Sequence, residues 1–184
     1  MKELGRAGHW RRLVALPLMS IVIAGCAFPG LEPEPMPTNM GGPEPIGPVT
    51  EIGRGESLGV PWRFWVYDST LGMCTRLELD GGGGGESCGG TLGADAAAGP
   101  IGVMSVGTGT GTPSSVEGFA SDEVAAVWIE TNAGRVQATL MSLGPVGLNG
   151  QMFIALVPGD RRMDAAVAVD ADGGDLGRFD ILGP

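Results

Sequence analysis

The sequence predicts an all-β domain in which two antiparallel sheets pack as a β-sandwich of about seven to nine strands, with a small β-barrel as the alternative. Three observations support this fold class. Apolar and polar residues alternate with a period of two along several short runs, turn signals separate these runs, and no run has the periodicity of a long helix. The predicted domain spans residues 51–184, which is long enough to support one hydrophobic core.

Half-buried strands are predicted where the alternation is clearest. The four runs are residues 62–67, 74–79, 135–140 and 163–170. In the last run the core face should consist of Met163, Ala165, Val167 and Val169. Two further runs, 124–130 and 152–157, are apolar on both faces and predict central strands that are covered on each side. We expect an Ig-like arrangement of these strands.

The N-terminus has the features of an export signal. Four basic residues, Lys2, Arg6, Arg11 and Arg12, precede the apolar run 13–24, which has the length of a secretory h-region and is too short to span a bilayer. The run ends at Ile23-Ala24-Gly25-Cys26, which resembles a bacterial lipobox. The resemblance implies that residues 1–25 are removed and that Cys26 is lipidated, which would anchor the protein outside the cytoplasm, at the cell membrane or cell envelope.

This interpretation divides the chain into three parts: a lipoprotein signal peptide over 1–25, the lipidated cysteine with a tether over 26–50, and the folded domain over 51–184. The tether contains seven prolines among its residues and too little apolar surface to fold alone. Proline-rich segments favour extended polyproline geometry, so we expect a spacer that holds the domain away from the membrane.

Two cysteines, Cys74 and Cys88, remain after Cys26 is lipidated, and we expect them to form a disulfide because exported proteins fold in an oxidising compartment. A redox-active pair is disfavoured because such pairs usually have the closer C-x-x-C spacing. Between the two cysteines, Gly81–Gly85 should form the tip of a hairpin.

Several short motifs occur in a recognisable order across residues 55–180. Gly59-Val60-Pro61-Trp62 precedes a strand with one cysteine, a glycine-rich loop leads to the second cysteine, and Asn132-Ala133-Gly134-Arg135-Val136 precedes a strand with Phe153. This order resembles a group of small exported actinobacterial proteins without an assigned activity. The resemblance implies no catalytic residue and no ligand.

Charge and composition exclude several classes of function. After residue 25 the chain has seven arginines, no lysine, no histidine and twenty acidic residues, a net charge of −13. Nucleic acid is excluded as a partner because binding to phosphate needs clustered cations. Catalysis that depends on histidine or lysine is excluded within the mature chain. We therefore expect a non-catalytic interaction or structural module with an envelope protein or a glycan as its partner, and no cofactor.

Two alternatives remain open. The first is a small-ligand or calcium-binding lipoprotein, with aromatic contacts from Trp65, Tyr67 and Trp128. Weak calcium binding would use Asp170, Asp172 and Asp175, although their spacing departs from an EF-hand and favours a hairpin turn. The second alternative is a glycan hydrolase that uses two carboxylates. Its candidates are Glu78, Asp80, Glu117, Asp122, Glu123 and Glu130.

Overall fold

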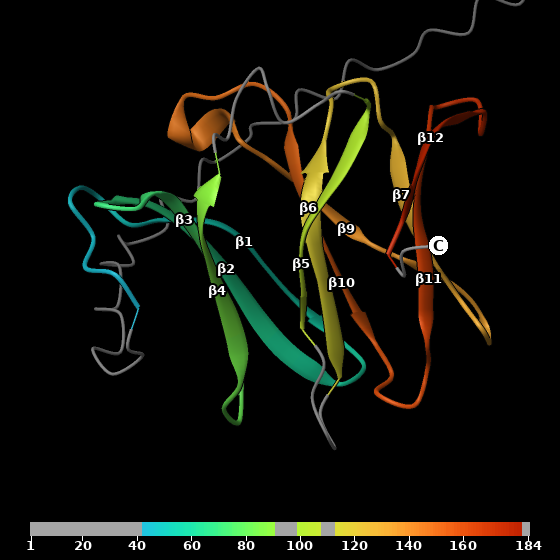
Figure 1. Ribbon diagram of the computed structural model, residues 1–184, viewed down its shortest axis with the longest axis horizontal. Coiled ribbons are helices and arrows are strands. Elements are labelled where there is room, and N and C mark those ends of the chain that lie inside the picture. Colours follow the sequence, from blue (N-terminus) through green and yellow to red (C-terminus); the bar gives the residue numbers. More distant parts are fainter. Residues whose placement is uncertain (1–41, 91–98, 108–112, 182–184) are drawn as a thin grey trace, which may run out of the picture. The chain divides into compact units, whose positions relative to one another are not determined.

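The computed structural model describes residues 42–90, 99–107 and 113–181, and in these residues twelve strands form three antiparallel four-stranded sheets (Figure 1). The predicted signal peptide, Cys26 and the first part of the predicted tether lie outside the described residues. Among the described residues no helix has the length and apolarity required to cross a bilayer.

The strands are distributed over the sheets as follows. Sheet A has the order β1 (Thr50–Ser57), β2 (Val60–Ser69), β3 (Gly72–Leu79) and β4 (Gly84–Gly90). Sheet B has the order β5 (Ile101–Gly107), β6 (Ser114–Ala120), β10 (Gln151–Val157) and β9 (Thr139–Ser142). Sheet C has the order β12 (Asp175–Asp180), β11 (Met163–Val169), β7 (Ala126–Thr131) and β8 (Gly134–Gln137). A 3-10 helix, η1 (Gly144–Val146), lies between β9 and β10.

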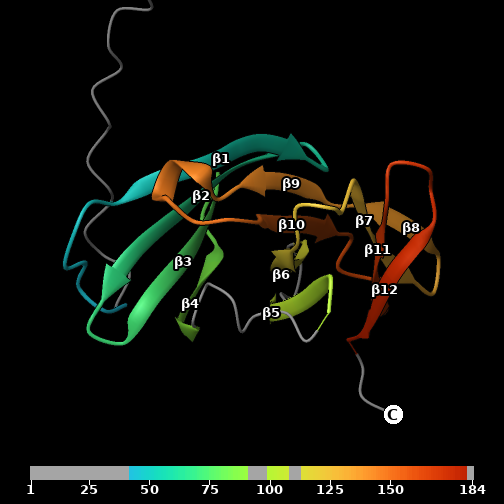
Figure 2. The same cartoon turned by 90° about the horizontal axis from the view of Figure 1, so that it is seen from above.

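Sheet B is the middle layer, with sheet A on one side and sheet C on the other (Figure 2). Two apolar clusters fill the spaces between the layers. The cluster between sheets A and B includes Trp62, Phe64, Leu77, Met152 and Ile154. The cluster between sheets B and C includes Val116, Val127, Ile129, Phe153 and Ala155. The prediction of an antiparallel β-sandwich is confirmed, but it has three layers and more strands than the seven to nine expected.

β10 shows why the middle layer exists. Its residues alternate between the two clusters, with Met152, Ile154 and Leu156 facing sheet A and Phe153, Ala155 and Val157 facing sheet C. All six are at most 3% exposed. A strand that is apolar on both faces needs a cover on each side, so the prediction for 152–157 is confirmed. Each sheet is open and has two edge strands, so the described residues do not form the alternative barrel.

The run 135–140 connects two layers. It forms β8 in sheet C and then β9 in sheet B, with the break at Ala138. The backbone N–H of Ala138 still donates to the carbonyl oxygen of Val127 on β7, at 2.9 Å. Val136, Ala138 and Leu140 all belong to the cluster between sheets B and C, as the alternation predicts. Residues 135–140 therefore connect sheet C directly to sheet B, the middle layer.

The facing predicted for β11 is wrong. Ala166 and Ala168 face the cluster between sheets B and C, whereas Ala165, Val167 and Val169 lie on the opposite face of sheet C. Met163 nevertheless belongs to the cluster, because the pairing of β11 with β7 shifts between Met163 and Ala165. A β-bulge of this kind reverses the facing of every residue beyond it. The outward-facing Val167 is still only 4% exposed.

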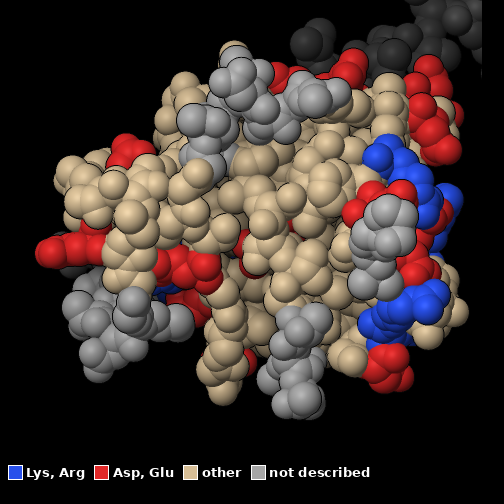
Figure 3. Space-filling view, viewed as in Figure 1, with Lys and Arg blue, Asp and Glu red and all other residues tan. Residues whose placement is uncertain are grey.

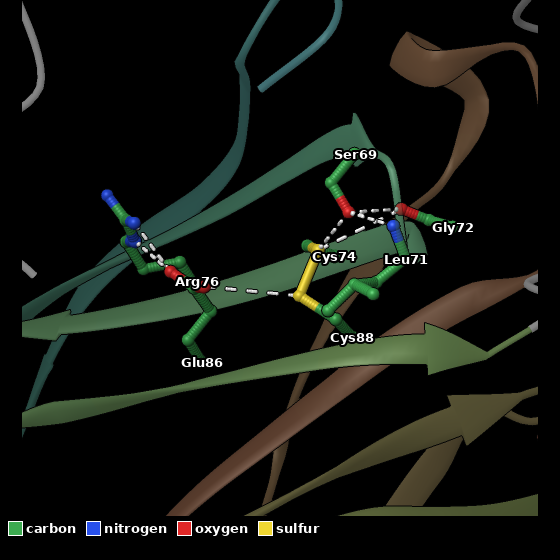
Figure 4. The surroundings of a disulfide bond; sticks show 7 residues. All are labelled: Ser69, Leu71, Gly72, Cys74, Arg76, Glu86 and Cys88. Atoms are coloured by element: carbon green, nitrogen blue, oxygen red, sulfur yellow. Dashed lines mark hydrogen bonds and ion pairs between the residues drawn. A yellow bond between two sulfur atoms is a disulfide. The ribbon is translucent and has the colours of Figure 1, made fainter. Parts of the chain in front are cut away.

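The β3–β4 hairpin contains the predicted disulfide between Cys74 and Cys88, which are paired across the two strands (Figure 4). Gly81, Gly82 and Gly83 form its turn with positive φ angles, which L side chains rarely adopt. At the other end of the hairpin, the Ser69 hydroxyl donates to the carbonyl oxygen of Gly72 at 2.9 Å and lies 3.1 Å from Cys74 Sγ. The disulfide therefore joins the last two strands of sheet A.

The described end of the tether lies against sheet A. The backbone N–H of Ile46 donates to the carbonyl oxygen of Asp68 at 2.8 Å, and Pro45 forms an isolated bridge with Ser69. A Cβ on Gly42 would collide with the Glu86 carboxylate of β4. The last residues of the predicted tether are therefore part of the folded unit, which begins before residue 51.

We expect loss of the disulfide to destabilise the domain. A cross-link across a loop of about fifteen residues constrains the unfolded chain by roughly 3 kcal/mol. The double variant Cys74→Ser/Cys88→Ser should lower the free energy of unfolding by about this amount, measured by urea denaturation. Wild-type protein unfolded in a reducing agent should match the variant. Equal midpoints for the variant and the oxidised wild type would contradict the prediction.

A second prediction concerns the close approach of β5, β6 and β10. A Cβ on Gly118 would meet the carbonyl oxygen of Gly102 and would lie 2.6 Å from the ring of Phe153. We expect Gly118→Ala to lower the free energy of unfolding by about 1–3 kcal/mol, because the closest contact is backbone and cannot move aside cheaply. Gly47→Ala, where nothing lies within 4 Å of the added Cβ, is the matched control. Equal thermal midpoints for both variants would refute this account of the packing.

Candidate functional site

The aromatic candidates of β2 lie on the outer face of sheet A, away from sheet B. Trp65 and Tyr67 face the same way as Arg76 of β3, which pairs with Trp65 in register. The Arg76 guanidinium lies 5.7 Å from the centre of the Tyr67 ring, a distance typical of a cation–π contact. Trp65 is 6% and Tyr67 2% exposed. The two side chains are therefore covered and do not form an open contact surface.

An ion pair connects this aromatic pair to the disulfide hairpin (Figure 4). Arg76 Nε donates to Glu86 Oε2 at 2.8 Å, from β3 to its register partner on β4. Burial raises the pKa of the Tyr67 phenol, and the nearby Glu86 carboxylate raises it further. Among the described residues, no hydrogen-bond partner is found for the indole N–H of Trp65.

Trp128 lies on the outer face of sheet C and is partly exposed. Its register partner on β11 is Val167, and Arg178 of β12 pairs with Val167 from the other side. Arg178 Nη1 pairs with Glu130 Oε2, and Arg135 Nη2 pairs with Glu130 Oε1 at 2.7 Å. Hydrogen bonds from Arg178 and Arg135 hold the pKa of Glu130 below its usual range. This face therefore combines an accessible indole with two arginines that a shared carboxylate orients.

The charge distribution sets sheet C apart. In Figure 3 the basic side chains gather at one edge of the view, over the region of β11 and β12, whereas acidic side chains are spread more widely. Arg162 adds a further pair there, with Nε 2.8 Å from Asp164 Oδ1. Arg135, Arg162 and Arg178 are each paired with a carboxylate there, so basic and acidic side chains are interspersed on this sheet.

The acidic turn proposed for calcium connects β11 to β12. Asp170 Oδ1 accepts hydrogen bonds from the backbone N–H of Asp172 at 2.9 Å and of Gly174 at 2.8 Å. This is the role of an aspartate in a turn. Asp172 and Asp175 are exposed, and the described residues contain no group of three or more His, Cys, Asp or Glu side chains placed to hold a metal ion. The structure therefore does not bring the three aspartates together.

The six carboxylates considered for hydrolysis are dispersed. Glu78 belongs to β3, Asp80 to the glycine turn, Glu117 to β6, Asp122 and Glu123 to the loop after β6, and Glu130 to β7. Asp122 Oδ1 accepts from the backbone N–H of Gly150 at 3.0 Å, and Ser121 Oγ donates to Glu123 at 3.3 Å. Glu130 is held by two arginines. Asp122, Glu123 and Glu130 thus serve local structure.

Glu117 is the exception, because it is buried in the space between sheets A and B. It is 2% exposed, and its register partners are Ile154 of β10 and Ser105 of β5. A Cβ built on Gly85 of β4 would lie 4.0 Å from Glu117 Oε1, so the carboxyl group reaches toward sheet A. No hydrogen bond or ion pair to it is found among the described residues. Burial raises the pKa of Glu117 to about 7.

A hollow of about 440 Å³ lies at one end of sheet B, and nothing in the sequence patterns predicts it. Its wall comes from four places in the chain: the start of β5, the end of β6, the loop around η1 and the start of β10. Phe119 and Leu148 are among its apolar side chains. The sequence feature nearest to the hollow is the series of glycines between β9 and β10. These glycines predict turns, but they do not predict a hollow beside the turns.

We expect the stability of the protein to fall between about pH 4.5 and pH 7 through Glu117. The folded state keeps this carboxyl protonated up to about pH 7, whereas its ordinary pKa is 4.5. The folded state binds the extra proton in this window, so raising the pH removes stability, up to about 3 kcal/mol. Glu117→Gln should abolish this loss, measured as the free energy of unfolding at pH 4.5 and pH 8.

The exposed Glu56→Gln serves as the control and should retain the pH dependence of the wild type. A Glu117→Gln variant with the same pH dependence as the wild type would show that Glu117 ionises freely in the folded protein.

No family model matches the chain, and no curated protein or solved structure gives a match.

Proposed function

We propose that the protein is a lipid-anchored, extracytoplasmic and non-catalytic interaction or structural module of the cell envelope. The Cys74–Cys88 disulfide is the observation that carries this proposal. Disulfides form and persist in oxidising compartments outside the cytoplasm, which is where the leader and Cys26 would deliver the chain. An anchor on Cys26 would tether the domain to the membrane, with the segment between Cys26 and the folded unit as a spacer.

The outer face of sheet C, with Trp128, Arg135 and Arg178, is the proposed contact face. Tryptophan and arginine are enriched among the residues that dominate binding energy at interfaces, and an indole also stacks on sugar rings. Trp65 and Tyr67 of sheet A are buried and therefore do not offer an aromatic surface to a partner. Since Glu130 orients both arginines, the face is organised before a partner arrives. An envelope protein or a glycan fits this chemistry.

A non-catalytic role is supported by the state of the carboxylates. Catalysis by two carboxylates needs an acid and a base that flank a substrate. Glu117 has the raised pKa suited to an acid but is buried among apolar side chains. Glu130 is held ionised by arginines on an exposed face. The two pKa values are shifted in opposite directions, as an acid and a base would require. However, the two residues lie on different sheets and face in opposite directions, so they do not flank a common substrate position.

The proposal predicts a partner that depends on the anchor. In-cell crosslinking of the tagged protein, followed by detergent extraction and mass spectrometry, should recover one stoichiometric partner. Cys26→Ala should move the protein out of the detergent-soluble membrane fraction and abolish the crosslink. Trp128→Ala should leave the protein in the membrane fraction and reduce the crosslink several-fold, as expected for an interface hot spot.

Leu71→Ala is the matched control for Trp128→Ala, because Leu71 is 61% exposed on the turn between β2 and β3 of sheet A. It should leave the crosslink intact. Fractionation of the wild type with soluble proteins would contradict the anchor, and equal crosslinking of the Trp128 and Leu71 variants would contradict the contact face.

A further inference from the structure

We propose that the hollow at the end of sheet B is a binding site for a small molecule that has an apolar body and a cationic amine. The proposal goes beyond the envelope role above and does not depend on the anchor. The hollow has a volume of about 440 Å³. This lies within the range of about 300–1,000 Å³ that is usual for small-molecule sites.

Hydrogen bonds build the rim of the hollow. The backbone N–H of Ser121 donates to the carbonyl oxygen of Pro100 at 3.0 Å, which fixes the end of β6 to the residue before β5. Leu143 and Gly150 close the η1 loop through a backbone hydrogen bond of 3.1 Å. Asp122 then fixes that loop to β6 through the N–H of Gly150. A rim held in this way is formed before a ligand binds, which reduces the ordering cost of binding.

The wall of the hollow is mainly apolar. Its larger apolar side chains are Ile101, Phe119, Leu143 and Leu148. Ile101 and Leu143 are buried in the two clusters, whereas Phe119 and Leu148 are only partly buried. The partly buried pair therefore has apolar surface left that a ligand would remove from water, which is favourable by about 25 cal/mol per Å².

The polar side chains of Asp122 and Gln151 determine which head group fits. Gln151 Nε2 donates to the carbonyl oxygens of Ser121 at 3.3 Å and Val124 at 3.0 Å, so both of its N–H groups are used. Asp122 uses Oδ1 to accept from Gly150. The groups of these two side chains that remain, Gln151 Oε1 and Asp122 Oδ2, are both acceptors, whereas the amide of Asn149, which also lines the hollow, has donors and an acceptor. A ligand head group that contacts Asp122 and Gln151 must therefore bring donors, and the negative charge at Asp122 favours a cation.

Among the described residues that line the hollow, none has a cationic side chain to compete for this carboxylate. The formal net charge of −10 also raises the local concentration of cations and disfavours anions. A ligand with an apolar body and an amine packs against the wall with its body and donates to the acceptors of Asp122 and Gln151 with its amine. An alcohol of the same shape would satisfy only the wall and one acceptor, and a carboxylate would meet like charge.

Three matched probes test the proposal on the full chain: 2-(1-naphthyl)ethylamine, 2-(1-naphthyl)ethanol and 1-naphthylacetate. Titrations followed by backbone amide NMR should give saturable shifts at Ser121, Leu148 and Gly150. We expect the amine to bind at least about tenfold more tightly than the alcohol, and the acid to bind most weakly.

Two variants assign this preference to the hollow. Asp122→Asn removes the charge but keeps an oxygen that can accept from Gly150, so it should reduce the preference for the amine to less than about twofold. Leu148→Ala should weaken the amine and the alcohol alike. Asp172→Asn, an exposed carboxylate on the β11–β12 turn, is the control and should change neither affinity.

The proposal is overturned if the alcohol binds as tightly as the amine, if the shifts map to residues outside the hollow, or if no probe gives saturable shifts at millimolar concentration. Each of these results leaves the anchored envelope role untouched, because that role is tested by fractionation and crosslinking.

Discussion

The double burial of sheet B is the constraint on which the rest of the structure depends. β10 is apolar on both faces. Its side chains are removed from water only if a second sheet covers one face and a third sheet covers the other. Sheet A supplies the larger aromatic side chains, including Trp62 and Phe64, and sheet C supplies small ones, including Ala166 and Ala168. The two cores have different shapes, yet one strand belongs to both.

Sequence patterns predicted the strands better than they predicted the layers. The alternation in 62–67 and 74–79 is kept in the structure, where Trp62, Phe64 and Leu77 lie on the core face, because no bulge interrupts the pairing of β2 with β3. The alternation in 163–170 assigned it wrongly, since the bulge after Met163 depends on the pairing with β7 and leaves no trace in the order of residues. Ala166 and Ala168 of β11 pack in the core between sheets B and C, where Val167 and Val169 were expected. The space between the two sheets, and not hydrophobicity alone, decides which side chains fit there.

The candidate sites were also predicted unevenly. The disulfide was predicted from the number of cysteines and from the expected export of the chain, both of which are read from the sequence. The burial of Trp65 and Tyr67 depends on what covers sheet A, and period-two patterning cannot reveal a cover. The hollow near Phe119 brings together chain segments that are distant in sequence, and the isolation of Glu117 depends on β4 lying opposite β6. Both are properties of the packing of layers.

Hydrogen exchange of backbone amides tests the three-layer account most directly. Amides in the middle strands β6 and β10 should exchange slowest and together, at the free energy of global unfolding, whereas the edge strands β1 and β12 should open locally and exchange faster. The result that would contradict the account is exchange in β10 as fast as in β1 and β12, because one of its faces would then be open to solvent.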